Sequence, residues 1–293
     1  MSARPLARVR AFAKINRSLH VLGIRPDGFH ELRTVFQSIA LHDTITIRAV
    51  EGPLRLTCDD PDCPCDETNL IWRAAEHVWK AAGRRGAPRD LTMQLSKRIP
   101  MQAGLGGGSS DAAAALRAFG RLWRVDAARV RAIAPSLGAD VPYFFEGGTV
   151  LGLERGDVLF PLVDAARAWV VLAVPSFGVS TKDAFAWWDR RPRAGSGRGA
   201  GLGPHMPVGL YDRGNDLQTV VAKRHPEIAR LVRALSRAGA TDAAMTGAGS
   251  AVFGLFSSRA AALAAVVAAS RPARRLLITR TVDRATCQTL AAS

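Results

Sequence analysis

The stretch Pro100-Met-Gln-Ala-Gly-Leu-Gly-Gly-Gly-Ser-Ser-Asp111 decides the fold. An alternating run at 91–99 predicts a strand before it, and an alanine-rich run predicts a helix after it, from about residue 110 to 123. Glycines lack Cβ, so their backbone adopts positive φ and approaches an anion closely. The helix directs the positive end of its dipole to the same place, and Ser109 or Ser110 is expected to cap it. Together these features predict a phosphate-binding loop instead of a flexible hinge.

The loop departs from two widespread phosphate-binding patterns. The Walker pattern requires Gly-Lys-Ser/Thr, whereas Gly108 is followed by Ser109. The dinucleotide fingerprint requires Gly-x-Gly-x-x-Gly, and a start at Gly104 places Ser109 at the last glycine position. Neither a Walker loop nor a dinucleotide fingerprint therefore explains the glycines.

Outward from the loop, hydrophobic periodicity predicts an α+β protein. The run 9–16 alternates as a strand does, which places Phe12, Lys14 and Asn16 on one face. Residues 68–82 carry one apolar stripe at helical spacing. Further elements expected in this half are strands at 44–47 and 54–58 and a short helix at 126–134 that stops before Pro135.

The second half predicts the order β-α-β-β-α-β, the split βαβ arrangement. The expected strands lie at 169–174, near 243–245, at 250–256 and at 275–282, and the expected helices at 226–237 and 259–270. The chain is therefore divided into an N-terminal domain, 1–160, and a C-terminal domain, 161–293. A stretch rich in Gly, Pro and Arg at 190–209 is expected to be a mobile insertion in the second domain.

Length and composition fit a globular protein of two domains. The chain has 293 residues, of which 48% are hydrophobic and 22% charged. No apolar run reaches the roughly 18 residues of a membrane span. Residues 1–9 lack the apolar core of a signal peptide. We therefore expect a cytoplasmic protein with no membrane partner.

The net charge of +15 resembles that of nucleic-acid-binding proteins. Only five of the 40 basic residues are lysines, however, and the arginines are scattered along the chain. A surplus of arginine over lysine is equally typical of proteins from GC-rich genomes. Since a basic surface also attracts phosphorylated metabolites, we expect a small-molecule substrate and no nucleic-acid partner.

The four cysteines do not predict a metal site. Cys58, Cys63 and Cys65 are closely spaced, and Cys287 lies far away. Their spacing does not match paired zinc motifs, and a clear fourth ligand is missing from the sequence. We expect reduced thiols in an acidic loop.

Two segments resemble a known family. The glycine loop resembles the Pro-x3-Gly-Leu-Gly-Ser/Gly-Ser-Ser-Ala/Asp motif of the galactokinase, homoserine kinase, mevalonate kinase and phosphomevalonate kinase (GHMP) superfamily. Residues 12–31 resemble the 4-diphosphocytidyl-2-C-methyl-D-erythritol kinases of the non-mevalonate isoprenoid pathway, whose pattern is Ala-Lys-Ile/Leu-Asn followed by Arg-x-Asp-Gly-Tyr-His. The match continues in family order at 32–46, 69–75, 138–144 and 245–253.

The resemblance implies two domains, an N-terminal ribosomal-protein-like domain and a C-terminal ferredoxin-like βαββαβ domain, with the active site between them. It also implies ATP and Mg²⁺, with Ser109, Ser110 and Asp111 as open candidates for the metal. A β-branched residue at Gly107, where positive φ is expected, should abolish ATP binding. The residues implied to hold ATP are Pro100, Met101, Gln102, Ala103, Gly104, Leu105, Gly106, Gly107, Gly108, Ser109 and Ser110 around the phosphates, and Asn69, Leu70 and Lys97 around adenine and ribose.

By the same resemblance, Asp140 is the base that takes the proton of the substrate's 2-hydroxyl, and Lys14 orients and polarises it. Phe29 and His30 would hold the cytosine, although Phe29 stands where the family usually has Tyr. The second aromatic side chain is Phe185, Trp187 or Trp188. The remaining substrate-binding residues implied are Asn16, Thr181, Gly247 and Gly249.

Two alternatives remain open from the sequence. A homoserine or mevalonate kinase would share the glycine loop, but its substrate has no base for Phe29 and His30 to hold. A basic RNA-binding module would use the ribosomal-protein-like domain, and it predicts salt-sensitive RNA affinity without ATP turnover.

Overall fold

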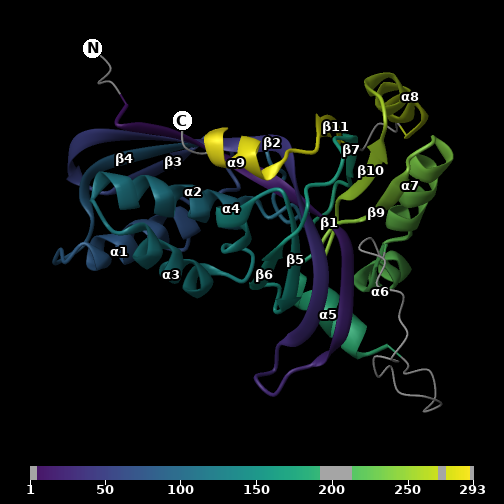
Figure 1. Ribbon diagram of the computed structural model, residues 1–293, viewed down its shortest axis with the longest axis horizontal. Coiled ribbons are helices and arrows are strands. Elements are labelled where there is room, and N and C mark those ends of the chain that lie inside the picture. The colour runs from purple at the N-terminus through teal and green to yellow at the C-terminus, as the bar shows by residue number, and fades with distance from the viewer. Residues whose placement is uncertain (1–4, 192–212, 270–274, 291–293) are drawn as a thin grey trace.

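The computed structural model describes residues 5–191, 213–269 and 275–290. All but the first two residues of the insertion expected at 190–209 lie outside this part of the chain. The described residues form two sheets, each packed against helices (Figure 1). The α+β fold of two domains is therefore confirmed.

The first sheet has the strand order β3-β4-β2-β1-β8, with β5 paired to β2 and β6 paired to β5. Because β1 and β2 pair with each other over nearly their whole length, both are longer than predicted. β2 is then long enough to pair with β4 toward one end and with β5 toward the other. The strands are β1 (Ala7–Ile24), β2 (His30–Pro53), β3 (Arg55–Cys58), β4 (Arg89–Ser96), β5 (Thr149–Glu154), β6 (Val158–Pro161) and β8 (Gly214–Asn215).

Four helices cover one face of this sheet (Figure 1). They are α1 (Leu70–Ala81), α2 (Gly107–Leu122), α3 (Ala127–Leu137) and α4 (Tyr143–Glu146). The apolar stripe of α1 and the alanines of α2 pack against alternate strand residues such as Ile45, Ile47 and Met93. This packing places the N-terminus of α2, and the loop before it, beside β1.

The second sheet has the order β11-β7-β10-β9, and every pair in it is antiparallel. The predicted βαββαβ arrangement is confirmed, and so is the ferredoxin-like domain. Its strands are β7 (Trp169–Val174), β9 (Asp242–Met245), β10 (Val252–Phe256) and β11 (Arg275–Arg280), and its helices are α5 (Thr181–Asp189), α6 (Asp216–Arg224), α7 (Pro226–Arg237) and α8 (Arg259–Ala269).

Helix α3 does not stop before Pro135, as the sequence predicted, but continues to Leu137. Proline has no N–H and disturbs the helix ladder at its own position. The cost is limited because Pro135 lies in the last turn of the helix.

The two halves of the sequence are interlocked. The first sheet runs to β6 and the second begins with β7, but β8 returns to pair with β1. Helix α9 (Arg284–Leu290), near the C-terminus, packs on the first domain, where Cys287 contacts Phe12. The first domain therefore contains residues from both halves of the chain.

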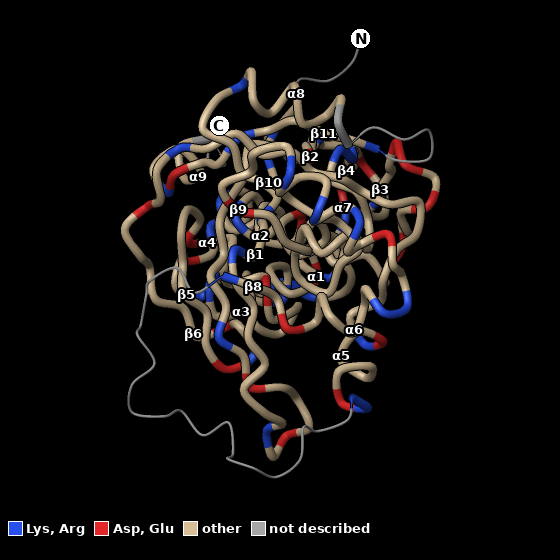
Figure 2. The backbone as a smooth tube through the Cα atoms, turned by 90° about the vertical axis from the view of Figure 1, so that its right-hand side faces the viewer, with Lys and Arg blue, Asp and Glu red and all other residues tan. Residues whose placement is uncertain are grey.

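The lengths of the helices and the distribution of charged residues bear on whether a membrane or a nucleic acid is a partner. Among the described residues no helix is long and apolar enough to cross a membrane. Basic and acidic positions are interspersed over many elements in the view of Figure 2. The charged positions are thus spread along the described backbone (Figure 2), as the scattered arginines of the sequence indicate.

Candidate active site

A cavity of about 920 Å³ is lined by residues of both domains. Two residues predicted for the site do not line it: the Ser110 hydroxyl donates to the Phe12 carbonyl, and Gly249 is packed against the Met245 side chain. The predicted residues that do line it are Lys14, Asn16, Phe29, His30, Asn69, Leu70, Lys97, Pro100, Met101, Gln102, Ala103, Gly104, Leu105, Gly106, Gly107, Gly108, Ser109, Asp140, Thr181, Phe185 and Gly247.

The helix that follows the glycine loop begins three residues earlier than predicted. Its first residue is Gly107, and its N-cap is Gly106 in the left-handed conformation, with no side-chain cap from the described residues. A cap by Ser109 or Ser110 is therefore wrong, because both serines lie within the first turn. The early start leaves the first backbone amides of α2 free of side-chain acceptors, so they are available to an anion.

Two glycines determine the path of the loop. Gly104 and Gly106 have φ of 73° and 69°. A Cβ on Gly104 would lie 2.1 Å from the Thr246 carbonyl oxygen, and one on Gly106 would lie 2.8 Å from the Phe144 ring. The positive φ expected at Gly107 is not found, because this residue already has helical backbone angles.

Lys14, Asn16 and Asp140 form a polar cluster in the cavity wall. The Lys14 ammonium lies 3.2 Å from an Asp140 carboxylate oxygen and donates to Asn16 Oδ1 at 2.6 Å. The Lys14 side chain is 4% exposed and that of Asp140 is 32% exposed. Asp140 is thus accessible to a substrate, while Lys14 holds it from the buried side. The Lys14 amide donates to the Leu105 carbonyl at 3.0 Å, which joins β1 to the glycine loop.

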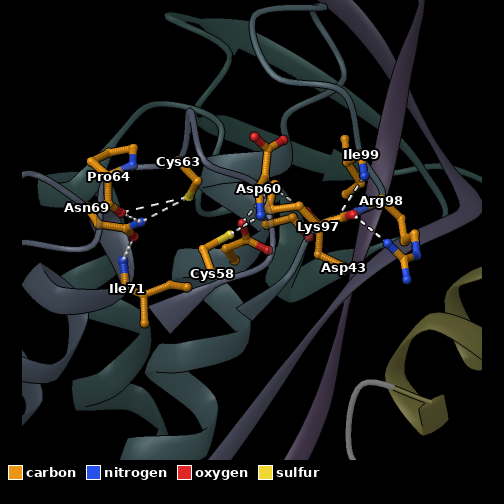
Figure 3. A network of polar contacts seen from close by, with 12 residues as sticks. Asp43, Cys58, Asp60, Cys63, Pro64, Asn69, Ile71, Lys97, Arg98 and Ile99 are labelled. Atoms are coloured by element: carbon orange, nitrogen blue, oxygen red, sulfur yellow. Dashed lines mark hydrogen bonds and ion pairs between the residues drawn. The ribbon is translucent and has the colours of Figure 1, made fainter. Parts of the chain in front are cut away.

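Beneath the loop, Lys97 binds two buried carboxylates. Its ammonium lies 2.5 Å from Asp43 and 2.9 Å from Asp111. Figure 3 shows Lys97 beside Asp43. Burial raises the pKa of Asp111 to about 7, against the opposing charge of Lys97 and with a further contribution from Asp43. Burial also disfavours the charged form of Lys97, but the two carboxylates outweigh it and raise its pKa above the ordinary value. Lys97 therefore lines the cavity with its charge already paired.

Asn69 forms a rigid part of the wall. Its Oδ1 accepts the Ile71 amide at 2.9 Å as the N-cap of α1, and its Nδ2 donates to the Pro64 carbonyl at 2.7 Å (Figure 3).

The cysteine beside Asn69 is not poised as a thiolate: burial and the adjacent Cys58 thiol raise the pKa of Cys63 to about 12. No group of three or more His, Cys, Asp or Glu side chains within the described residues is arranged to hold a metal ion.

At another part of the wall, His30 and Phe185 stack with ring centroids 4.4 Å apart. His30 Nε2 lies 2.8 Å from Asp189 Oδ1, so the imidazole is held from a second side. The neighbouring Phe29 is 55% exposed and has the Arg155 guanidinium 5.2 Å from its ring centroid. Phe29 is thus not part of the hydrophobic core.

The choice among the three aromatic residues of α5 follows from their surroundings. Phe185 lines the cavity. Trp188 is buried and presents its face to the Arg191 guanidinium, and Trp187 lies against Arg224 and His225. Of the three, Phe185 is therefore the one positioned to contact a ligand there.

Sequence reasoning assigned no role to Thr246 or Asp43, although both lie inside the segments that matched the family. Thr246 is fully buried and its hydroxyl accepts the Asn16 amide at 2.9 Å. Asp43 is fully buried and accepts the amides of Arg98 and Ile99 as well as the Lys97 ammonium. Both make contacts to residues far away in the sequence, which no local pattern reveals.

Comparison with known proteins agrees with this geometry. The sequence patterns of "GHMP kinases N terminal domain" and "GHMP kinases C terminal" match residues 69–148 and 194–273. The chain is 41% identical over 280 residues to 4-diphosphocytidyl-2-C-methyl-D-erythritol kinase of Solibacter usitatus, covering 91% of this chain and 86% of that protein. It is 38% identical to the enzyme of the same name from Pelotomaculum thermopropionicum, with 93% and 97% covered.

Solved structures show the same relationship. A crystal structure of 4-(cytidine 5'-diphospho)-2C-methyl-D-erythritol kinase superposes with a TM-score of 0.77 at 31% identity, covering 94% of this chain and 99% of that one. A mevalonate kinase shares the fold, with a TM-score of 0.67 at 12% identity over 94% of this chain and 99% of that one. The resemblance inferred from the sequence is therefore confirmed. This chain belongs to the ATP-dependent GHMP kinases and, within them, to the family of 4-diphosphocytidyl-2-C-methyl-D-erythritol kinases.

Proposed function

We propose that this kinase transfers the γ-phosphoryl group of ATP to the 2-hydroxyl of 4-diphosphocytidyl-2-C-methyl-D-erythritol, with Asp140 as the base. The observation that carries the assignment of roles is the pairing of a partly exposed carboxylate with the buried Lys14 ammonium, 3.2 Å apart, in a cavity that the glycine loop also lines. Phosphoryl transfer depends mostly on positioning and charge stabilisation, which these groups supply.

Each part of the site has one role in this proposal. The amides at the start of α2 bind the ATP phosphates, since no side-chain cap from the described residues occupies them. Asp140 takes the proton of the attacking hydroxyl. The Lys14 ammonium holds Asp140 in place and offsets the negative charge that gathers on the transferring group.

We further propose that Mg²⁺ accompanies ATP and is held mainly by the phosphates and water, as is usual for this ion. Among the described residues, few side-chain oxygens near the loop lack a partner. Ser110 donates to the Phe12 carbonyl, and Asp111 Oδ2 accepts from Lys97. The Ser109 hydroxyl and Asp111 Oδ1 have no hydrogen-bond partner among the described residues, and both residues line the cavity, so these two oxygens are the protein ligands that fit best. The ion would neutralise phosphate charge there.

The aromatic group of Phe29, His30 and Phe185 is proposed to bind the cytosine. Phe29 is exposed at the cavity and has a ring on which a base can stack. The imidazole of His30 is held by Asp189 and Phe185, so its orientation is fixed before a ligand arrives. Homoserine and mevalonate offer no base to this group, which favours the cytidine substrate over either of them.

The test is an ATP-dependent phosphorylation assay with the cytidine substrate, mevalonate and homoserine in parallel. We expect turnover with the cytidine substrate and at most traces with the other two. Turnover of mevalonate or homoserine at equal efficiency would refute the substrate assignment. RNA affinity without any ATP turnover would refute the kinase assignment itself.

A further inference from the structure

One edge of β1 joins the glycine loop to the turn at 247–250, which contains Gly247 and Gly249. Along this edge, the amide of Lys14 donates to the carbonyl of Leu105 in the glycine loop, and Ser18 pairs with Gly214 of β8. Between them lies the amide of Asn16, which faces no described strand on this edge, while β2 pairs with Asn16 on the other edge. Its acceptor is the side-chain hydroxyl of Thr246, at 2.9 Å. A single hydroxyl from the second domain thus completes the edge of the strand that carries Lys14.

Thr246 also fixes the backbone of the glycine loop. Its hydroxyl donates to the Gly104 carbonyl at 3.1 Å, and its own carbonyl oxygen lies where a Cβ of Gly104 would be. From behind, Asn215 Nδ2 donates to the carbonyls of Met245 and Gly247, both at 2.8 Å. Thr246 is fully buried and is held on both sides, by the glycine loop and through Asn215 of β8.

The orientation of the Asn16 amide group follows from its neighbours. The Ser18 carbonyl can only accept, so the Thr34 hydroxyl donates to it at 2.7 Å. Thr34 then accepts Asn16 Nδ2, also at 2.7 Å, which leaves Asn16 Oδ1 facing the Lys14 ammonium. Fixing the Asn16 backbone therefore fixes the acceptor that aims Lys14 at Asp140.

We infer that Thr246 is a positioning residue of the phosphoryl-transfer site, acting through Asn16 on Lys14 and through Gly104 on the phosphate loop. The inference rests on the proposed function, because it concerns the same Lys14 and Asp140 pair. It goes further in assigning the second domain a part in the geometry of the reaction. A displacement of about 1 Å at reacting groups lowers a rate by as much as 10²-fold.

The test replaces the hydroxyl with a methyl group in Thr246→Val and restores it in Thr246→Ser. For Val, we expect kcat to fall by roughly 10- to 100-fold, with the KM of the cytidine substrate changed less than about threefold. For Ser, kcat should return to within about threefold of wild type. The matched control is Thr281→Val, since the buried Thr281 hydroxyl also accepts a backbone amide at 2.9 Å, from Ala168, outside the cavity. This control should lose thermal stability and keep its kcat.

Several results would overturn the inference. One is a Thr246→Val enzyme that loses stability but keeps its kcat, as Thr281→Val should. Another is a change confined to the KM of the cytidine substrate. The third is a Thr246→Ser enzyme whose kcat stays as low as that of Thr246→Val. If Thr246→Val does not fold, Thr246→Ala takes its place, and the same fall in kcat is expected. If neither variant folds, the hydroxyl serves stability alone and the inference is wrong. Wild-type turnover is measured first, so absence of kinase activity points to the proposed function and not to Thr246.

Discussion

The Asp140 carboxylate owes its position to one neighbour, Lys14, and its accessibility to the cavity. Asp140→Asn keeps the shape of the side chain but removes the base. We expect kcat to fall by roughly 10²–10⁴-fold, the usual contribution of a positioned acid–base group. ATP affinity, measured by titration, should change little because the phosphates bind at the glycine loop. Asp62→Asn, in an exposed loop, is the control and should leave kcat as in wild type. A near-normal kcat for Asp140→Asn would remove this residue from the chemistry.

Base recognition can be tested at Phe29, whose ring is largely exposed. Stacking of a base on an aromatic ring contributes about 1–3 kcal/mol. Phe29→Ala should therefore raise the KM of the cytidine substrate by roughly 5- to 150-fold, at 1.4 kcal/mol per decade. Phe29→Tyr keeps the ring and should be nearly neutral, and Phe160→Ala, an exposed phenylalanine that does not line the cavity, is the control. An equal loss for ATP and the cytidine substrate would mean that Phe29 only supports the fold.

The positions of single site residues were predictable where a local sequence pattern determines which face of an element they occupy. Alternation along 9–16 placed Lys14 and Asn16 on one face, and both line the cavity. Thr246 was not predictable, because a threonine before a glycine turn looks the same whether or not a strand 230 residues away needs its hydroxyl. Long-range hydrogen bonds of this kind leave no period in the sequence.

At the scale of elements, the glycine loop is shaped by two glycines with positive φ and by close backbone contact. Gly104→Ala introduces both strain and a clash, since its Cβ would lie 2.1 Å from the Thr246 carbonyl oxygen. Gly86→Ala is the matched control: its φ of 71° is similar, but nothing lies within 4 Å of the new Cβ. We expect Gly86→Ala to cost about 1–2 kcal/mol of stability and leave the KM of ATP unchanged. Gly104→Ala should raise that KM at least tenfold, and equal effects of the two variants would contradict the role of the contact.

The buried triad of Asp43, Lys97 and Asp111 joins β2, the end of β4 and α2. Folding raises the pKa of Asp111 from about 3.8 to about 7, mainly through burial. Between these values the folded state binds a proton that the unfolded state lacks, so this contribution to stability is present at low pH and is lost as the pH rises. Asp111→Asn keeps a neutral side chain and should flatten the pH dependence by up to about 1.4 kcal/mol per pH unit. Urea unfolding from pH 4.5 to 7.5 measures this, and an unchanged slope would show that Asp111 does not titrate there.

The sequence predicted most elements correctly where periodicity was strong, as in α1, α7 and β7. It failed at two helix ends. The start of α2 was missed because serine caps are common, whereas this helix starts at a glycine and keeps its amides free. The end of α3 was missed because Pro135 usually stops a helix, whereas here it falls in the last turn. In both cases the contacts and function of the folded protein outweigh the local preference of serine to cap a helix or of proline to end one.

At the scale of the whole molecule, the order βαββαβ was predictable and its interlocking with the first domain was not. Helix α9 is short, and α9 and β8 owe their places to contacts with distant segments. Arg284 shows the nature of these contacts. Its amide donates to Asp164 at 2.9 Å, and its guanidinium donates to the carbonyls of Thr149 and Leu162 at 3.0 and 3.1 Å. The start of α9 is thus tied to the segment where the first sheet ends.

This connection predicts that a change near the C-terminus weakens the N-terminal domain. Arg284→Ala leaves the two carbonyls without their charged donor, and we expect a loss of roughly 2–4 kcal/mol in the free energy of unfolding. The matched control is Arg167→Ala, because Arg167 makes a 3.0 Å ion pair with Asp283 from a side chain that is 75% exposed. Exposed pairs contribute little, so this variant should lie within about 1 kcal/mol of wild type. Urea unfolding followed by tryptophan fluorescence measures the change, and three of the six tryptophans, Trp72, Trp79 and Trp123, pack in the first domain. Equal stability of the two variants would mean that α9 rests on the first domain without supporting it.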